Sequence, residues 1–235
     1  MLEAKNVCLA IEGKHLLKDI NFKAEEGSFI CIAGANGSGK TLMLKTLCGV
    51  LQPSAGAVFL NGRDISLYDI RQKSMLMRFL PAVLQSVFNY KVKDIVLMGT
   101  NPHIKWWQDY TAQNEAAAYA ALQNTDAAHL AERDIFTLSD GEMQRVFIAQ
   151  ILSAQPKAIL PDEPTSHLDL KQKNDVFKLF LKAAQNGRIV ICATHDIELA
   201  KKYATHICLL KNGEIDGFAP AAQIGDADIA RVYGL

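Results

Sequence analysis

Two hydrophobic spacings alternate along the chain, and their order predicts the fold class. Short apolar runs, which are typical of buried strands, occur at residues 28–33, 158–160, 188–193 and 206–210. Apolar residues recur at helical spacing at residues 40–50, 141–154 and 171–185. Further strands are predicted at residues 2–11, 15–24 and 57–60, and a tight turn is predicted at Asn61-Gly62. Alternating strands and helices predict an α/β fold whose mainly parallel sheet has helices on both faces.

One long stretch interrupts this alternation. Residues 86–137 are dominated by helix formers, and residues 112–131 are especially rich in Ala, Leu, Gln and Glu. We therefore predict a single domain in which a helical subdomain is inserted into an α/β core. The predicted parts of this domain, 1–235, are the core at about 1–85 and 155–217, the helical subdomain at about 86–154, and a short helical tail at 218–235.

Charge and hydropathy restrict the function classes. The chain has 25 basic and 25 acidic side chains, and this balance argues against a non-specific nucleic-acid binder, which usually carries a basic excess. No run of about 18 apolar residues occurs, and the first residues lack the layout of a signal peptide. The five cysteines form no CxxC pair, so we interpret them as reduced small hydrophobes. We therefore expect a cytoplasmic protein that binds no nucleic acid.

A glycine-rich segment carries the clearest chemistry. Residues 34–41 read GANGSGKT, which fits GxxxxGK[ST], and they lie between a predicted strand and a predicted helix. Such a loop turns backbone N–H groups toward phosphate oxygens, and the helix N-terminus favours negative charge. The predicted nucleotide-binding residues are Gly34, Asn36, Gly37, Ser38, Gly39, Lys40, which can reach the β- and γ-phosphates, and Thr41, which can bind Mg²⁺. The motif alone indicates nucleotide binding, because kinases, GTPases and many ATPases share it.

A pair of acids follows a later strand. Residues 158–165 read AILPDEPT, so an apolar strand ends in Asp162 and Glu163. In a protein with a phosphate loop, Asp162 is predicted to hold Mg²⁺, directly or through water. Glu163 is predicted to act as the base, or to position the water that attacks the γ-phosphate.

Several further segments together resemble the ABC ATPases. Residues 138–145, LSDGEMQR, resemble the signature sequence usually written LSGGQ, and their distance from Asp162 is the spacing that family shows. The other matching segments are Ser166-His167-Leu168-Asp169, which resembles the D-loop, Thr194-His195-Asp196, which resembles the switch histidine, and Gln85, at the place of the Q-loop glutamine. The order and spacing cover residues 2–217. The resemblance therefore implies a P-loop NTPase with the ABC-ATPase fold and an N-terminal antiparallel β part.

The resemblance also implies how the site is completed. Ser139 and Gly141 would bind the phosphate of a nucleotide held by a second subunit, so two ATP molecules would lie between two head-to-tail chains. His195 would contact the γ-phosphate. Gln85 would act in catalysis and at the Mg²⁺, and Asp169 would link the two sites. In the family, such a dimer joins two transmembrane permease subunits at the cytoplasmic face of the membrane and is served indirectly by a substrate-binding protein.

Four residues depart from the family's usual pattern. Asp140 and Glu142 replace a glycine and a glutamine in the signature, which adds negative charge beside an expected phosphate. Acids in a first helical turn are nevertheless favoured by the helix dipole. Pro161 cannot donate to the sheet, so its strand should lose a hydrogen bond or end there. Ile11 stands where an aromatic residue commonly stacks on adenine, which suggests weaker selectivity for the base.

The segment after Gln85 bears on the transported substrate. Residues 86–103 resemble the FxxTVxDxVxxGRxPH stretch of ATPases that serve iron-chelate, haem and cobalamin importers, and the LSDGE form of the signature also points to that branch. Phe88 and Tyr90 would line the groove for the permease, or would simply pack the helical subdomain. The same two alternatives apply to the pair Trp106-Trp107. Gln85 lies about three residues closer to Phe88 than that branch would suggest.

Three classes of function stay open at this point. The leading one is the ATPase subunit of an importer, which powers uptake of a metal chelate such as iron-siderophore, haem or cobalamin. A second is a soluble ABC ATPase with a mechanical task, although the tandem cassettes or long insertions frequent in such proteins are absent from this sequence. A third is another P-loop enzyme, such as a small-molecule kinase, which would leave the signature unexplained. An importer of another substrate class is a further alternative.

Overall fold

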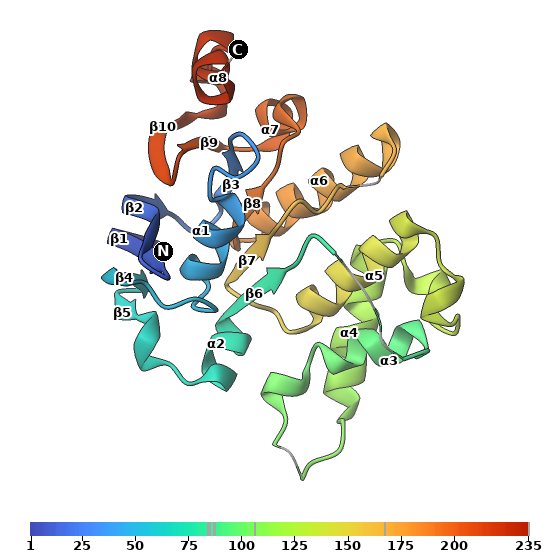
Figure 1. The fold of residues 1–235 in the computed structure, drawn as a ribbon. Coiled ribbons are helices and arrows are strands. Elements are labelled where there is room, and N and C mark those ends of the chain that lie inside the picture. The colour runs from blue at the N-terminus through green and yellow to red at the C-terminus, as the bar shows by residue number, and fades with distance from the viewer. Residues whose placement is uncertain (84–85, 87, 106, 167, 235) are drawn as a thin grey trace.

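A six-stranded sheet forms the centre of the molecule (Figure 1). The computed structural model describes residues 1–83, 86, 88–105, 107–166 and 168–234. The sheet has the order β10-β9-β3-β8-β7-β6. Its strands are β3 (Phe29–Ala33), β6 (Met77–Leu80), β7 (Ala158–Pro161), β8 (Ile189–Ala193), β9 (His206–Lys211) and β10 (Glu214–Pro220). Strands β3, β6, β7, β8 and β9 run parallel to one another, whereas β10 pairs antiparallel with β9. The prediction of a mainly parallel sheet is therefore confirmed.

The N-terminal strands belong to a second, antiparallel sheet of order β2-β1-β4-β5. Its strands are β1 (Leu2–Ile11), β2 (Lys14–Ala24), β4 (Ala55–Leu60) and β5 (Arg63–Asp64). The predicted tight turn joins β4 to β5, and both of its residues, Asn61 and Gly62, have positive φ, at 51° and 79°. This is the backbone conformation that Asn-Gly sequences favour in hairpins.

The helices lie mainly around the central sheet (Figure 1). The α-helices are α1 (Lys40–Leu47), α2 (Ile70–Leu76), α3 (Val92–Met98), α4 (Ala112–Asn124), α5 (Asp140–Ser153), α6 (Leu170–Gln185), α7 (Ile197–Tyr203) and α8 (Asp226–Tyr233). Short 3₁₀ turns occur at Ile65–Leu67, Asn101–His103, Ala128–Leu130, Ile135–Thr137 and Ala221–Gln223. Throughout the described ranges, the helices are too short or too polar to cross a bilayer.

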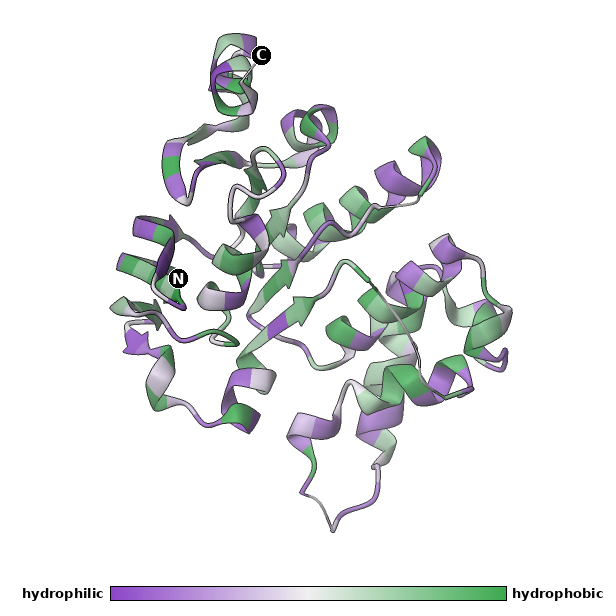
Figure 2. Ribbon diagram, in the orientation of Figure 1, coloured by the Kyte–Doolittle hydropathy of each residue, from purple (hydrophilic) through white to green (hydrophobic). Residues whose placement is uncertain are grey.

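Two hydrophobic clusters cover the two faces of the central sheet. One lies between this sheet, α1 and the antiparallel sheet, and it includes Ile30, Ile32 and Leu210. The other lies under α6, α7 and α8. Because both faces are covered, every residue of β3 and β8 is buried. Figure 2 shows the resulting hydrophobic strands at the centre and mixed hydropathy along α6.

A third hydrophobic cluster joins α3, α4 and α5, and it includes Val96, Leu122 and Val146. These are the helices of the predicted helical subdomain, but α5 also contributes Ile148 and Ile151 to the cluster on the sheet. The exact limits of the subdomain therefore stay a prediction. The predicted C-terminal tail begins differently, because β10 continues through Pro220 before the helical turns start.

The proline in β7 ends its strand, as the sequence predicts. Pro161 pairs in register with Leu80 but has no N–H to donate. The next residue, Asp162, donates its N–H to the Leu80 carbonyl at 2.8 Å and forms a single bridge with Ala193. The chain thus leaves the sheet at the point where its two acids begin.

Candidate functional site

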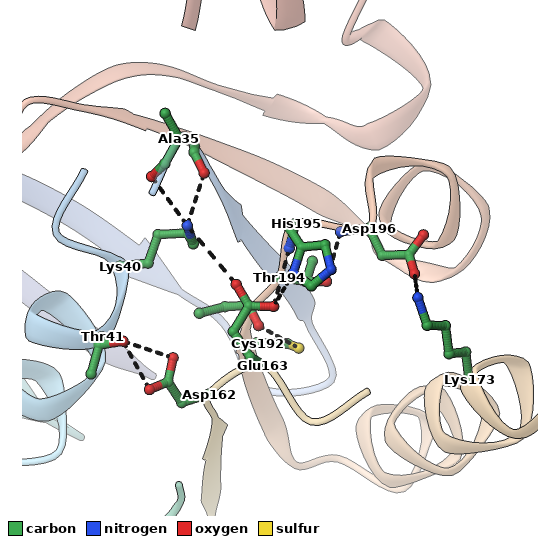
Figure 3. Close-up of polar contacts among 12 residues, drawn as sticks. Ala35, Lys40, Thr41, Asp162, Glu163, Lys173, Cys192, Thr194, His195 and Asp196 are labelled. Carbon is green, nitrogen blue, oxygen red and sulfur yellow. Dashed lines mark hydrogen bonds and ion pairs between the residues drawn. The ribbon is translucent and has the colours of Figure 1, made fainter. Parts of the chain in front are cut away.

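Three neighbouring strands end at the same edge of the central sheet and place there the predicted residues of the phosphate loop, the two acids and the histidine. The loop at 34–39 follows β3, Asp162 and Glu163 follow β7, and Thr194 and His195 follow β8. Ligands of open α/β sheets bind outside the carboxyl ends of the strands. Figure 3 shows Lys40, Glu163 and His195 pointing toward one another at this edge.

Backbone conformation and lack of space both require glycine in the phosphate loop. Gly37 and Gly39 have φ of 78° and 104°, in the left-handed region. Gly34 has no room for a side chain, because a Cβ there would collide with the carbonyl oxygen of Leu210 on β9. The Ser38 hydroxyl is buried and has no hydrogen-bond partner among the described residues. A buried hydroxyl without a partner in such a loop fits a site that receives a polar ligand.

The lysine of the loop is folded back over it. Lys40 is only 7% exposed, and its Nζ donates to the carbonyl oxygens of Gly34 at 2.8 Å and Ala35 at 3.3 Å. The same Nζ lies 3.9 Å from Oε1 of Glu163. The ammonium therefore sits between the loop and the acid after β7 (Figure 3), where it can meet a phosphate placed on the loop.

Thr41 and Asp162 form the second contact across the site. The Thr41 hydroxyl lies 3.0 Å from Oδ1 and 2.8 Å from Oδ2 of Asp162, which is 4% exposed. Burial raises the pKa of Asp162, the hydrogen bond from Thr41 opposes that shift, and the neighbouring charge of Glu163 reinforces it. Described residues include no group of three or more His, Cys, Asp or Glu side chains able to hold a metal. One hydroxyl and one carboxylate nonetheless fit Mg²⁺, which usually takes few protein ligands beside water and substrate phosphates.

The side chain of Glu163 points away from that of Asp162 and toward the residues at the end of β8. Its backbone has φ of 45°, unusual for a residue with a side chain, and its N–H donates to the Ala193 carbonyl at 2.9 Å. Its Oε2 accepts from the His195 backbone N–H at 3.3 Å and lies 2.6 Å from His195 Nδ1. The carboxylate is therefore held between the lysine and the histidine, a geometry suited to orienting a water molecule.

The residues expected to bind a partner's nucleotide lie at the start of α5. Ser139 caps this helix, and Glu142 N–H donates to its hydroxyl at 3.4 Å. In return, the Ser139 backbone N–H and hydroxyl donate to Oε2 of Glu142 at 2.8 and 2.9 Å. The sequence alone predicts that both groups are available to an anion, whereas in the structure the Glu142 carboxylate binds them. These bonds and the nearby Arg133 lower the pKa of Glu142.

Two other elements complete the surroundings of the signature segment. Asp169 caps α6, with the Gln172 N–H donating to its Oδ1 at 2.8 Å, and the Gln172 amide fills the place where Gly141 would carry a side chain. Among the described residues, no hydrogen bond or ion pair joins Ser139 or Asp169 to the phosphate loop. The signature segment and the phosphate loop are thus separate within one chain.

Two contacts around these residues are additional to those expected from the sequence. Lys173 on α6 forms an ion pair of 2.8 Å with Asp196, next to His195 (Figure 3). Gln172 closes a capping box on Asp169, and the pattern Asp-x-x-Gln before an apolar helix is a signal that could have found it. No sequence signal reveals the ion pair, because its two residues come from different elements.

The remaining predicted residues have varied outcomes. Gln85 and Trp106 lie outside the described residues. Ile11, at the end of β1, is 42% exposed, so its side chain is available at the surface. Phe88 and Tyr90 are exposed and contact each other edge to face, with centroids 6.0 Å apart. They are not buried in the cluster of α3, α4 and α5, so the packing alternative does not account for them.

Comparisons with known proteins agree with this geometry. The family model described as "ABC transporter" matches residues 17–166. The hemin import ATP-binding protein HmuV of Hahella chejuensis is 36% identical over 99% of this chain and 92% of that protein. A chain from an inward-facing structure described as a metal-chelate type ABC transporter has a TM-score of 0.86 and is 27% identical, over 100% of this chain and 89% of that one. A dimeric bacterial ABC transporter cassette has a TM-score of 0.79 and is 26% identical, over 95% of this chain and 100% of that one.

Proposed function

Because this chain belongs to the ABC transporter family of ATP-binding proteins and is an ATPase, we propose that it powers an importer of metal chelates such as haem or an iron-siderophore complex. The observation that carries the site assignment is the convergence of Lys40, Glu163 and His195 at the carboxyl edge of β3, β7 and β8.

The phosphates of ATP would lie on the loop at 34–41. Backbone N–H groups and the N-terminus of α1 favour negative charge there, and the unpartnered Ser38 hydroxyl would gain a partner. Lys40 would exchange the carbonyl oxygens of Gly34 and Ala35 for phosphate oxygens. Since the lysine is already buried in place, little side-chain entropy remains to be lost when it binds.

Mg²⁺ would be held by Thr41 and Asp162, together with the phosphates and water. Bound in this way, the ion would offset the negative charge that develops on the transferred phosphoryl group. Thr41 would turn its hydroxyl hydrogen away from Asp162, and the carboxylate of Asp162 would have to be ionised. The proposal therefore requires the proton that burial favours on Asp162 to be absent when the metal binds.

Glu163 would orient the attacking water and accept its proton, with His195 on the opposite side of the carboxylate. The 2.6 Å contact with His195 Nδ1 and the nearby Lys40 hold the carboxylate toward the site. His195 would contact the γ-phosphate with its other ring nitrogen. Gln85 and Asn36 are proposed to complete the ATP site, and Asp169 to connect it to the second site.

Ser139 and Gly141 would bind the nucleotide of a second subunit, in a head-to-tail dimer. Support for this comes from the separation of α5 from the phosphate loop within one chain and from the likeness to a dimeric cassette. Binding in trans would require the Ser139 hydroxyl and N–H to exchange the Glu142 carboxylate for a phosphate. Two such subunits with two permease subunits, served by a substrate-binding protein, are proposed to form the importer at the cytoplasmic face of the membrane.

The metal-chelate class rests on the similarity to a hemin import ATP-binding protein and to a metal-chelate type transporter. The exposed pair Phe88–Tyr90 offers an apolar contact for the permease. Co-expression with a metal-chelate permease and its binding protein, followed by uptake of haem or an iron-siderophore complex into vesicles, tests the substrate class. If the vesicles take up neither compound but do take up another substrate, the proposed substrate class is wrong, and the assignment as an ATPase stands.

Replacement of Glu163 by glutamine tests the catalytic assignment. Glutamine has the same shape and can still accept the His195 N–H, but it cannot take a proton, so hydrolysis should fall by about 10²–10⁴-fold. Binding of a fluorescent ATP analogue should stay within twofold of the wild-type protein, and ATP should stabilise a dimer visible by light scattering. Glu198→Gln, on the exposed side of α7, is the matched control and should hydrolyse ATP normally. Normal hydrolysis by Glu163→Gln would refute the assigned base.

A further inference from the structure

The side-chain amide of Gln172, in the first turn of α6, packs against the backbone of the signature segment. Gly141, the one glycine of α5, is buried in the first turn of that helix. Its helical conformation is one that other residues adopt readily, and alanine is the better helix former. A Cβ at Gly141 would nevertheless lie 2.5 Å from Nε2 and 2.7 Å from Cδ of Gln172. The amide therefore occupies the place that a side chain at Gly141 would need.

Asp169 holds the same amide from the other side. The Asp169 N–H donates to Oε1 of Gln172 at 3.3 Å, and the Gln172 N–H donates to Oδ1 of Asp169 at 2.8 Å. These two hydrogen bonds form the capping box of α6, so the glutamine side chain is folded back over the start of its own helix. The amide thus lies between Asp169 and Gly141 and sets their separation.

The first turn of α6 is itself tied to the edge of the central sheet. Lys173 forms its 2.8 Å ion pair with Asp196, and the two side chains are only 23% and 20% exposed. Asp196 follows His195, whose Nδ1 lies 2.6 Å from Oε2 of Glu163 (Figure 3). Two adjacent residues of α6 therefore face two ways: Lys173 toward the proposed ATP site of its own chain, and Gln172 toward the signature segment.

A cleft borders the contact between Gly141 and Gln172. It is lined by residues from the N-terminal halves of both helices, among them Arg145 of α5 and Asp175 of α6. Because this cleft keeps the two helices apart, the amide of Gln172 spans a gap between them. A displacement of α6 would reach the signature segment through this amide, since tightly packed groups transmit small movements instead of absorbing them.

We propose that Gln172 is a positioning residue of the site formed between two subunits: its amide fixes the signature segment relative to Asp169, so that both meet the partner subunit in one arrangement. This inference rests on the proposed function, in which Ser139 and Gly141 bind the nucleotide of a second subunit. A purely structural glutamine would only cap α6, and its loss would affect stability alone. A positioning glutamine would also be needed for the ATP-dependent dimer.

Gln172→Ala separates these roles, with Gln72→Ala as the matched control. Gln72 closes the same kind of capping box on Asp69, whose N–H donates to its Oε1 at 3.1 Å, but α2 buries none of its residues. Both variants lose a capping amide, so both should have a lower melting temperature. In the full chain carrying Glu163→Gln, Gln172→Ala should raise the Kd of the ATP-dependent dimer about three- to tenfold, the size of one neutral hydrogen bond. Analytical ultracentrifugation should show no such rise in Gln72→Ala, and ATP binding to the monomer should be unchanged in both.

A double substitution tests the contact itself. In Gly141→Ala the new methyl group would collide with the Gln172 amide, so the ATP-dependent dimer should weaken. Combining Gly141→Ala with Gln172→Ala makes room for the methyl group, so the dimer Kd should be lower than in Gly141→Ala alone. Simple addition of the two effects, or an unchanged dimer Kd in Gln172→Ala, would overturn the inference while leaving the ATP site intact. Absence of any ATP-dependent dimer in the Glu163→Gln chain with Gln172 intact would instead overturn the proposed shared site.

Discussion

Adjacent residues can take opposite roles when the backbone between them turns, and Asp162 and Glu163 are such a pair. Asp162 bridges to Ala193 through its backbone and turns its side chain to Thr41. Glu163 has φ of 45° and turns to His195. Backbone conformations of this kind carry strain and concentrate at functional sites. The two acids thereby point to different neighbours, as the proposed metal and water roles require.

Replacement of Asp162 by asparagine should have opposite effects on stability and on activity. Because burial raises the pKa of Asp162 in the folded chain, the folded state binds more protons than the unfolded state, and stability falls as pH rises between the two pKa values. Asparagine removes the buried charge, so the unfolding free energy at pH 7 should increase. That gain should disappear below the unfolded-state pKa, which urea titrations at several pH values would reveal.

The same variant should lose Mg²⁺-dependent hydrolysis, because an amide is a poorer ligand for Mg²⁺ than a carboxylate. In the wild-type chain, hydrolysis at limiting Mg²⁺ should decline as the pH is lowered through the raised pKa of Asp162. Thr111→Ser, a conservative change in the cap of α4, serves as the control and should leave both profiles unaltered. Unchanged Mg²⁺ dependence in Asp162→Asn would remove Asp162 from the metal site.

The residues at this edge were predictable from the sequence, whereas their contacts were not. The glycine spacing of the loop and the acids after an apolar strand identify Lys40, Asp162 and Glu163. The sequence does not reveal that Lys40 folds onto the Gly34 carbonyl, or that Glu142 binds Ser139. Side-chain directions of this kind depend on neighbours that are brought close only by the completed fold.

Among the elements, α5 shows how a departure in the signature is accommodated. Glu142 lies in the first turn, where it completes a capping box with Ser139 and pairs with Arg133 at 3.3 Å. Its negative charge is therefore matched by N–H groups, by a guanidinium and by the helix dipole. The negative charge of Glu142 in the signature thus stabilises the start of α5.

Two substitutions at Glu142 separate its cap from its charge. Glu142→Ala removes the carboxylate that accepts from Ser139 and should lower the unfolding free energy by about 1 kcal/mol. Glu142→Gln keeps the capping geometry and should lose less. Because the folded-state pKa of Glu142 is lowered, its charge stabilises above the unfolded-state pKa, and this contribution is lost as pH falls through the folded-state pKa. In Glu142→Gln this loss of stability in acid should be absent. An equal loss of unfolding free energy in the wild-type chain and in Glu142→Gln as the pH falls would contradict this role of the Glu142 charge.

The spacing of hydrophobic residues predicts most elements, because the central strands are buried on both faces and the helices are buried on one face. Their ends were harder to predict. Helix α1 stops at Leu47 instead of Val50, because Gly49 adopts φ of 73°. Strand β10 runs to Pro220, so the first residues of the predicted helical tail, 218–220, are extended. Element ends depend on caps and on tertiary pairing, which a hydrophobic pattern does not contain.

At the scale of the whole molecule, the separation of α5 from the phosphate loop is the feature that supports the proposed second subunit. The fold class, the parallel sheet and the insertion of helices were predictable from one chain, and the structure confirms the fold. The arrangement between two chains rests on resemblance, because the contacts among the described residues all lie within one chain.

Ser139→Arg tests the arrangement between subunits. The bulky cation would block the surface offered to the partner's nucleotide, so hydrolysis should fall to near background. Binding of ATP to the monomer should equal that of the wild type, because Ser139 makes no contact with its own phosphate loop. Lys40→Ala is the control, which should lose monomer binding as well. An equal loss of monomer affinity in Ser139→Arg would place the signature in the same chain's site.

The strand order also has a consequence for biosynthesis. Strand β3, which leads into the phosphate loop, pairs on one side with β8 and on the other with β9. Both partners lie more than 150 positions later, at 189–193 and 206–211, so a ribosome completes the loop long before its neighbours exist. Long-range parallel pairing is slow to form and leaves strand edges exposed until it is complete. A nascent chain should therefore be unable to capture nucleotide until β8 and β9 have left the ribosome.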